Sequence, residues 1–143
     1  MRSKAVTMGE VADIMQAREQ LDEALRIRLE EELPVYERLG DVRSKAVTMG
    51  QVADILQARG QLNEAVRIRQ EEELPVYEQL GDVRSKAITQ WQIALAMLES
   101  ADPKREHACL LLTEAHEALK AMGLPEADTL AAQMTALGLA PPA

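Results

Sequence analysis

The segment RSKAVTMG occupies residues 2–9 and recurs unchanged at residues 43–50, and a third start, RSKAIT, lies at residues 84–89. Each start follows the one before it by 41 residues (43 − 2 = 41 and 84 − 43 = 41). The copies 2–42 and 43–83 differ at only seven positions, whereas the third copy diverges after Thr89. A fixed period of this length predicts an array of supersecondary units that stack on one another.

Each copy predicts two helices joined by a short turn. We expect the first helix to start near Ser3, a suitable N-cap residue, and the turn to lie around residues 18–21. A second helix is expected from about Asp22 to Leu39, ending at Gly40. The apolar residues of the first helix recur at helical spacings of 3, 3, 1 and 3: Ala5, Met8, Val11, Ala12 and Met15.

The second helix contains one irregularity. Its apolar stripe slips across residues 30–32, and Pro34 follows within the helix without an N–H group to donate. We therefore expect a kink or a one-residue π-bulge near residues 30–34, and again near residues 71–75. An inherited insertion explains such a bulge more simply than a functional role.

Met8, Val11–Ala12 and Met15, together with LDEA at residues 21–24 and LNEA at residues 62–65, resemble the tetratricopeptide repeat over residues 2 to about 124. The period of 41 exceeds the 34 residues usual in that family and resembles longer repeats, of about 40–42 residues, in bacterial multidomain signalling proteins. The resemblance implies an all-α fold, a right-handed α-solenoid with about seven helices. It would form one domain over residues 1–143, with three helix-turn-helix repeats (2–42, 43–83 and 84–124) and a capping helix at 125–138.

The resemblance also implies a concave wall that binds a protein or peptide partner. Its small or polar positions in the first two copies are replaced by apolar residues in the third, on one helical face. That apolar stripe is either a docking site anchored by Trp91 or, as we favour, a surface covered by the capping helix or a second chain. The positions are Gly9, Asp13, Gln16, Gly50, Asp54, Gln57, Trp91, Leu95 and Leu98.

An alternative function is self-association through the first copy. Met8, Val11 and Met15 match residues that the second copy would bury against a preceding helix, so we expect an exposed apolar strip. A homodimer or a domain-swapped assembly would cover this strip. Equally, the chain could be an excised fragment of a longer repeat array. A third hypothesis, which we favour less, is an engineered or excised model of repeat architecture with no independent function.

The amino-acid composition limits the classes of binding partner and the cellular compartment that we expect for this protein. The net charge of −8 disfavours nucleic acid and anionic membranes, and favours neutral or basic protein partners. The single cysteine, Cys109, suggests a reducing compartment, and no signal or spanning segment is evident, so we expect a cytoplasmic protein.

Catalytic chemistry is not expected. His107 and His116 are nine residues apart on one helix and therefore face opposite sides. The glutamates at 30–32 and 71–73 are interpreted as solvated faces, which neighbouring arginines neutralise: Arg26, Arg28, Arg67 and Arg69. We therefore expect no enzyme activity, no cofactor and no metal site.

Overall fold

The computed structural model describes residues 2–18, 20–101 and 103–139, and within these ranges helices are the only regular secondary structure. The prediction of an all-α fold is confirmed. Counting each uninterrupted helical run once, the described residues form seven helices, as expected. The chain divides into two compact units, residues 1–76 and 77–143.

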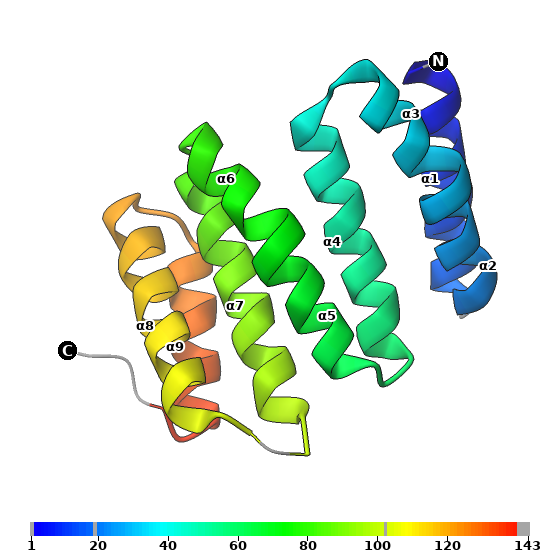
Figure 1. Ribbon diagram of the computed structural model, residues 1–143. Helices are drawn as coiled ribbons and strands as arrows, with labels where there is room; N and C mark the ends of the chain where they lie inside the picture. The colour runs from blue at the N-terminus through cyan, green and yellow to red at the C-terminus, as the bar shows by residue number, and fades with distance from the viewer. Residues whose placement is uncertain (1, 19, 102, 140–143) are drawn as a thin grey trace. The chain divides into compact units, whose positions relative to one another are not determined.

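The first unit contains the first copy and most of the second copy (Figure 1). Helix α1 (Arg2–Ala17) packs against a second run that joins α2 (Leu21–Ile27), the π-helical turn η1 (Arg28–Glu32) and α3 (Leu33–Leu39). That run also packs against α4 (Val42–Ala58). The corresponding run of the second copy joins α5 (Leu62–Ile68), η2 (Arg69–Glu73) and α6 (Leu74–Leu80).

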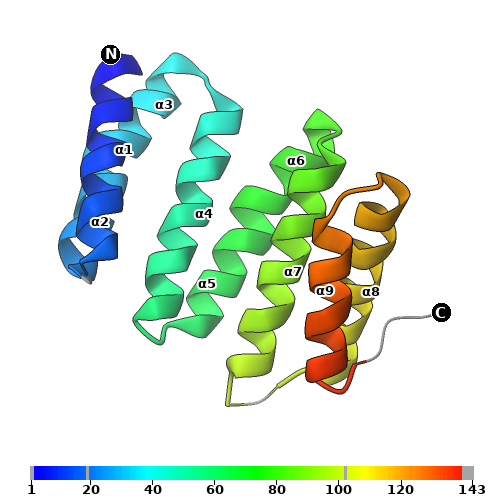
Figure 2. The ribbon, with the colours of Figure 1, turned by 180° about the vertical axis from the view of Figure 1, so that it is seen from behind.

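The second unit begins within α6 and contains α7 (Val83–Glu99), α8 (Arg105–Ala121) and α9 (Glu126–Ala136) (Figure 2). Helix α8 packs against both α7 and α9. The helix expected over residues 125–138 is present as α9, with Pro125 as its N-cap residue. Leu130 and Met134, two of the apolar residues that predicted it, are fully buried.

Small residues allow the paired helices of the first unit to approach closely. Ala12 of α1 and Ala24 of α2 are both fully buried, and so are Ala53 and Ala65 in the second copy. Around this close approach, the core of the second copy is completed by Val52, Leu56 and Ile68. Leu25 and Met49 pack against this core. The alanine of the LDEA and LNEA motifs therefore sets the distance between the helices.

The predicted helix interruption is confirmed, slightly earlier than expected. The N–H of Leu33 donates to the carbonyl of Arg28, five residues back, and the N–H of Leu74 donates to Arg69 in the same way. The leucine that follows each wide turn directly precedes a proline, Pro34 or Pro75. Since proline has no N–H to donate, a helical run that contains it accommodates an extra residue at little further loss of hydrogen bonding.

The helix ends are defined by glycine and aspartate, not by serine as expected. Gly40 and Gly81 adopt left-handed backbone conformations with φ of 66° and 67°, which end the preceding helical runs. The next residues, Asp41 and Asp82, then cap the following helices. The backbone N–H of Ser44 donates to Asp41 Oδ1 at 3.0 Å, and Ser85 makes the equivalent bond with Asp82. The prediction of a serine N-cap is thus wrong for the second and third copies, because the aspartate three residues earlier takes that role.

Replacement of Asp82 tests this assignment. We expect Asp82→Ala to lower the free energy of unfolding by about 1 kcal/mol, because the first turn of α7 loses its acceptor. Asp82→Asn should retain most of the stability, since an amide oxygen also accepts. Urea unfolding followed by circular dichroism measures all three proteins. If Ser85→Ala is more damaging than Asp82→Ala, the capping assignment is incorrect.

Candidate functional site

A buried ionic cluster lies between α1 and η1 in the first copy. Arg28 is only 1% exposed, and its guanidinium donates through Nη1 to Glu32 Oε1 at 3.0 Å and through Nη2 to Asp13 Oδ1. Glu32 is also buried, whereas Asp13 is largely exposed. An arginine removed from water requires such partners, because an unpaired buried charge is strongly destabilising.

The second copy repeats this cluster. Arg69, again 1% exposed, donates to Glu73 Oε1 at 3.2 Å, to Asp54 Oδ1 and to the carbonyl oxygen of Gly50 at 3.3 Å. The repetition of the geometry shows that it is encoded by the 41-residue sequence unit.

Glycine makes room for each buried carboxylate. A Cβ atom added to Gly50 would lie 2.9 Å from Glu73 Cδ and still closer to Oε2. Gly9 stands in the same relation to Glu32. The wide turns place the arginine and the glutamate four residues apart, both directed at the helix that carries the glycine. The expectation that these glutamate clusters are solvated is therefore wrong for Glu32 and Glu73, although Glu30 is exposed.

Burial changes the proton affinity of this second cluster. Desolvation raises the pKa of Glu73 from its ordinary value of 4.5 to about 7, and the favourable charge and hydrogen bond of Arg69 only partly oppose the effect. The negative charge of Asp54 adds to the rise. Glu73 consequently exchanges its proton near neutral pH.

A polar groove opens above the first cluster, with a volume of about 430 Å³. Asp13, Gln16 and Asp54, three of the positions predicted to form a concave wall, all contribute to its lining. Gly9 and Gly50 are buried against the glutamates, and Gln57 is half-buried outside the lining. The remaining lining residues are Ala17, Arg28 and Gln51.

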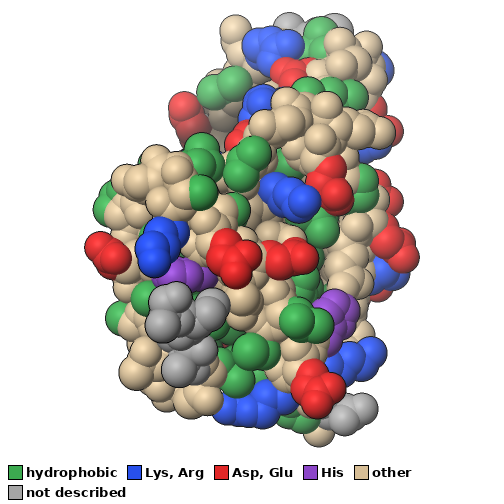
Figure 3. All heavy atoms as spheres, turned by 90° about the vertical axis from the view of Figure 1, so that its left-hand side faces the viewer, with side chains coloured by type: hydrophobic (Ala, Val, Ile, Leu, Met, Phe, Trp, Pro, Cys, Tyr) green, Lys and Arg blue, Asp and Glu red, His purple; other side chains and the backbone are tan. Residues whose placement is uncertain are grey.

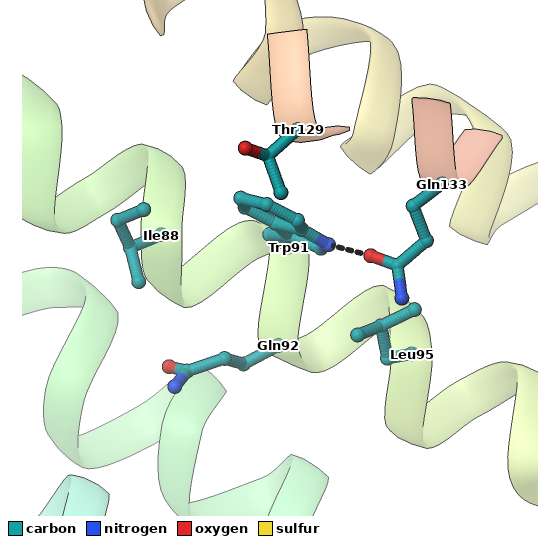
Figure 4. Close-up of a pocket in the computed structure, with 6 residues that line it drawn as sticks. All are labelled: Ile88, Trp91, Gln92, Leu95, Thr129 and Gln133. Atoms are coloured by element: carbon teal, nitrogen blue, oxygen red, sulfur yellow. Dashed lines mark hydrogen bonds between the residues drawn. The ribbon is translucent and has the colours of Figure 1, made fainter. Parts of the chain in front are cut away.

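A second groove, of about 530 Å³, lies in the second unit between α7 and α9 (Figure 4). Its centre is Trp91, which is half-buried and donates from Nε1 to Oε1 of Gln133 at 2.6 Å. Leu95 lies beside it, and Leu98, the third predicted position, is half-buried outside the lining. Helix α9 therefore contacts the predicted apolar stripe and leaves a groove along it. The other lining residues are Ile88, Gln92 and Thr129.

The third copy replaces the whole ionic cluster with apolar residues. Where the second copy has Gly50 and Asp54, the third has Trp91 and Leu95. If Ala65 and Ala108 are aligned and the extra residue of η2 is removed, Leu112 and Ala115 occupy the places of Arg69 and Glu73. Both are fully buried. All four positions of the ionic cluster thus differ between the second and third copies.

The predicted self-association residues lie on α1, and each is half-buried: Met8, Val11 and Met15. Their counterparts Val52 and Leu56 in α4 are 2% and 7% exposed. Sequence reasoning missed Ile14, which is 51% exposed although its counterpart Ile55 is fully buried. Its helical position beside Val11 was the available signal.

Among the described residues, His, Cys, Asp and Glu side chains form no group of three or more that could hold a metal ion. Within the same ranges, no helix combines the length and apolar character needed to cross a membrane. On the side of the second unit seen in Figure 3, acidic, basic and hydrophobic side chains are interspersed.

A scan against protein-family models, a search of the curated proteins and a search of the solved structures each found no match to this chain.

The raised pKa of Glu73 predicts a pH-dependent stability. Between pH 4.5 and 7 the folded state binds the proton of Glu73 more tightly than the unfolded state, so this group's contribution falls as the pH rises through that window. The expected fall is about 3 kcal/mol for this residue. Urea unfolding of the wild type and of Glu73→Gln at pH 5 and pH 8 measures it. An equally steep decline in both proteins would contradict the prediction.

The glycine contact predicts a specific coupling. Gly50→Ala should lower the free energy of unfolding by about 1–3 kcal/mol, because the Glu73 carboxylate, which is buried and accepts a hydrogen bond from Arg69, must shift to make room for the methyl group. In an Arg69→Leu/Glu73→Ala background, which copies Leu112 and Ala115, the same change should be neutral or stabilising by up to about 1 kcal/mol. Chemical denaturation of the four proteins gives the coupling energy. Equal effects of Gly50→Ala in both backgrounds would refute the contact.

Proposed function

We infer that this protein is a helical-repeat scaffold of the tetratricopeptide type, a right-handed α-solenoid that binds a partner peptide or domain through the surface of its repeats. Pairs of helices with a 41-residue sequence period support this interpretation. The LDEA and LNEA motifs, whose alanines are fully buried at the close approach of two helices, also support it.

The observation that carries the proposal is the groove around Trp91. The exposed surface of its lining is mainly apolar, and it lies where the first two copies have glycine and aspartate. A half-buried tryptophan fixed by Gln133 is a rigid anchor of the kind found at the centre of protein interfaces. The favoured ligand is a short peptide that inserts an aliphatic side chain between Trp91 and Leu95.

The polar groove of the first unit is suited to a basic ligand. Asp13 and Asp54 each use one carboxylate oxygen to bind a buried arginine, which holds both side chains in position. These carboxylates would favour a basic residue of the partner, in keeping with the net charge of −8.

Peptide selection tests the role of the Trp91 groove. A random peptide library displayed on phage would be panned on the wild-type chain, and each enriched peptide synthesised and titrated by calorimetry. We expect apolar peptides whose affinity falls at least tenfold in Leu95→Asp, which restores the residue type of the first two copies. Leu110→Asp, on the exposed face of α8, is the matched control and should bind normally. Peptides that bind Leu95→Asp as tightly as wild type would exclude this groove as the binding site.

A further inference from the structure

Among the residues that the structure describes, the outer face of α1 is much more exposed than the same face of α4. In α4, Thr48, Val52 and Ile55 lie on one helical face and are 1%, 2% and 0% exposed. Their counterparts in α1 are Thr7, which is exposed, Val11, which is half-buried, and Ile14, which is 51% exposed. Residues of identical type therefore occur once covered and once uncovered in the same unit.

The structure also shows which kind of element covers this face. Helix α4 packs against the run formed by α2, η1 and α3, and Leu25 of that run contacts the apolar cluster that includes Val52. The surface thus fits an amphipathic helix with the sequence of residues 21–39. The residues that form this face are the same in α1 and α4. The face on α1 is therefore complementary to the same kind of amphipathic helix.

Charges at the two ends of this face specify the orientation of the covering helix. Arg59, at the end of α4, forms an ion pair with Asp22 at the start of α2, with Nε 3.5 Å from Oδ1. At the start of α7 in the second unit, Lys86 Nζ lies 3.8 Å from Glu78 Oε2, near the end of α6. The basic counterparts in α1 are Arg18 and Lys4, both exposed. A matching helix carries an acidic residue near each end and runs antiparallel to α1.

We propose that the face of α1 formed by Lys4, Thr7, Val11, Ile14 and Arg18 binds an acidic amphipathic helix of the type formed at residues 21–39, presented by a partner polypeptide. Asp22 and Glu37 supply the acidic ends of that pattern, and Leu25 supplies its apolar contact. This surface is separate from the Trp91 groove, so the two binding activities are tested independently.

Binding of a synthetic peptide tests the proposal. A fluorescein-labelled peptide of residues 21–40 would be titrated with the full chain and followed by fluorescence anisotropy. We expect saturable binding that weakens at least tenfold in Ile14→Asp, because a charge is placed at the centre of the contact. Val47→Asp is the matched control, since Val47 is 44% exposed on α4 and lies off this face. Circular dichroism establishes that both variants are folded.

A charge exchange tests the orientation without altering the apolar contact. Arg18→Asp should weaken binding of the wild-type peptide about twofold to fivefold, as expected for an exposed ion pair. A peptide with Asp22→Arg should restore the affinity for Arg18→Asp and bind the wild-type chain less well. This pair of measurements tests the proposal even if Ile14→Asp does not fold.

Three results would overturn the proposal. The first is absence of saturable binding to the wild type, and the second is an equal loss in Ile14→Asp and Val47→Asp. The third is a homodimer, observed by sedimentation equilibrium, that Ile14→Asp dissociates and the peptide does not. That result would assign the face to a second copy of the chain.

Discussion

The contact between a buried arginine–carboxylate pair and a backbone glycine governs the packing of the first unit. Arg28 and Glu32 are buried together, and the glutamate rests on the backbone at Gly9. Burying such a pair gains little stability over an apolar core of the same volume, but a mismatch would leave a charge without a partner. The pair therefore fixes the register of the η1 turn against α1, and the same holds for η2 against α4.

The π-helical turns carry the arginine and the glutamate that make this contact. An uninterrupted α-helix of the length of α8 presents Leu112 and Ala115, three residues apart, to its neighbour. In η1, which holds one extra residue, the two residues that face α1 are Arg28 and Glu32, four residues apart. In this way the insertion exchanges an apolar contact for an ionic one, and the carboxylate of Asp13 is drawn to the groove surface by the same arginine.

The repeat, the helices and the position of the helix interruption were predictable, because each depends on local periodicity or on proline. The capping residue was not, since Asp41 and Ser44 are both good caps and only the αL conformation of Gly40 determines which is used. Burial of Glu32 was also missed, because a run of three glutamates is ordinarily solvated and the tertiary contact with Gly9 decides otherwise. The Trp91 stripe was recognised, whereas the groove beside it depends on where α9 is placed.

The differences between the second and third copies show which side chains replace the ionic cluster. Glycine, aspartate, arginine and glutamate in the second copy correspond to tryptophan, leucine, leucine and alanine in the third: Gly50, Asp54, Arg69 and Glu73 against Trp91, Leu95, Leu112 and Ala115. Gly50→Trp alone would place a bulky side chain on the carboxylate of Glu73, and loss of both Asp54 and Glu73 would leave Arg69 buried without a carboxylate partner. The four positions are therefore epistatic. Exchange of the ionic version for the apolar one therefore needs coordinated changes, which constrains substitution at these positions even where the cluster adds little to stability.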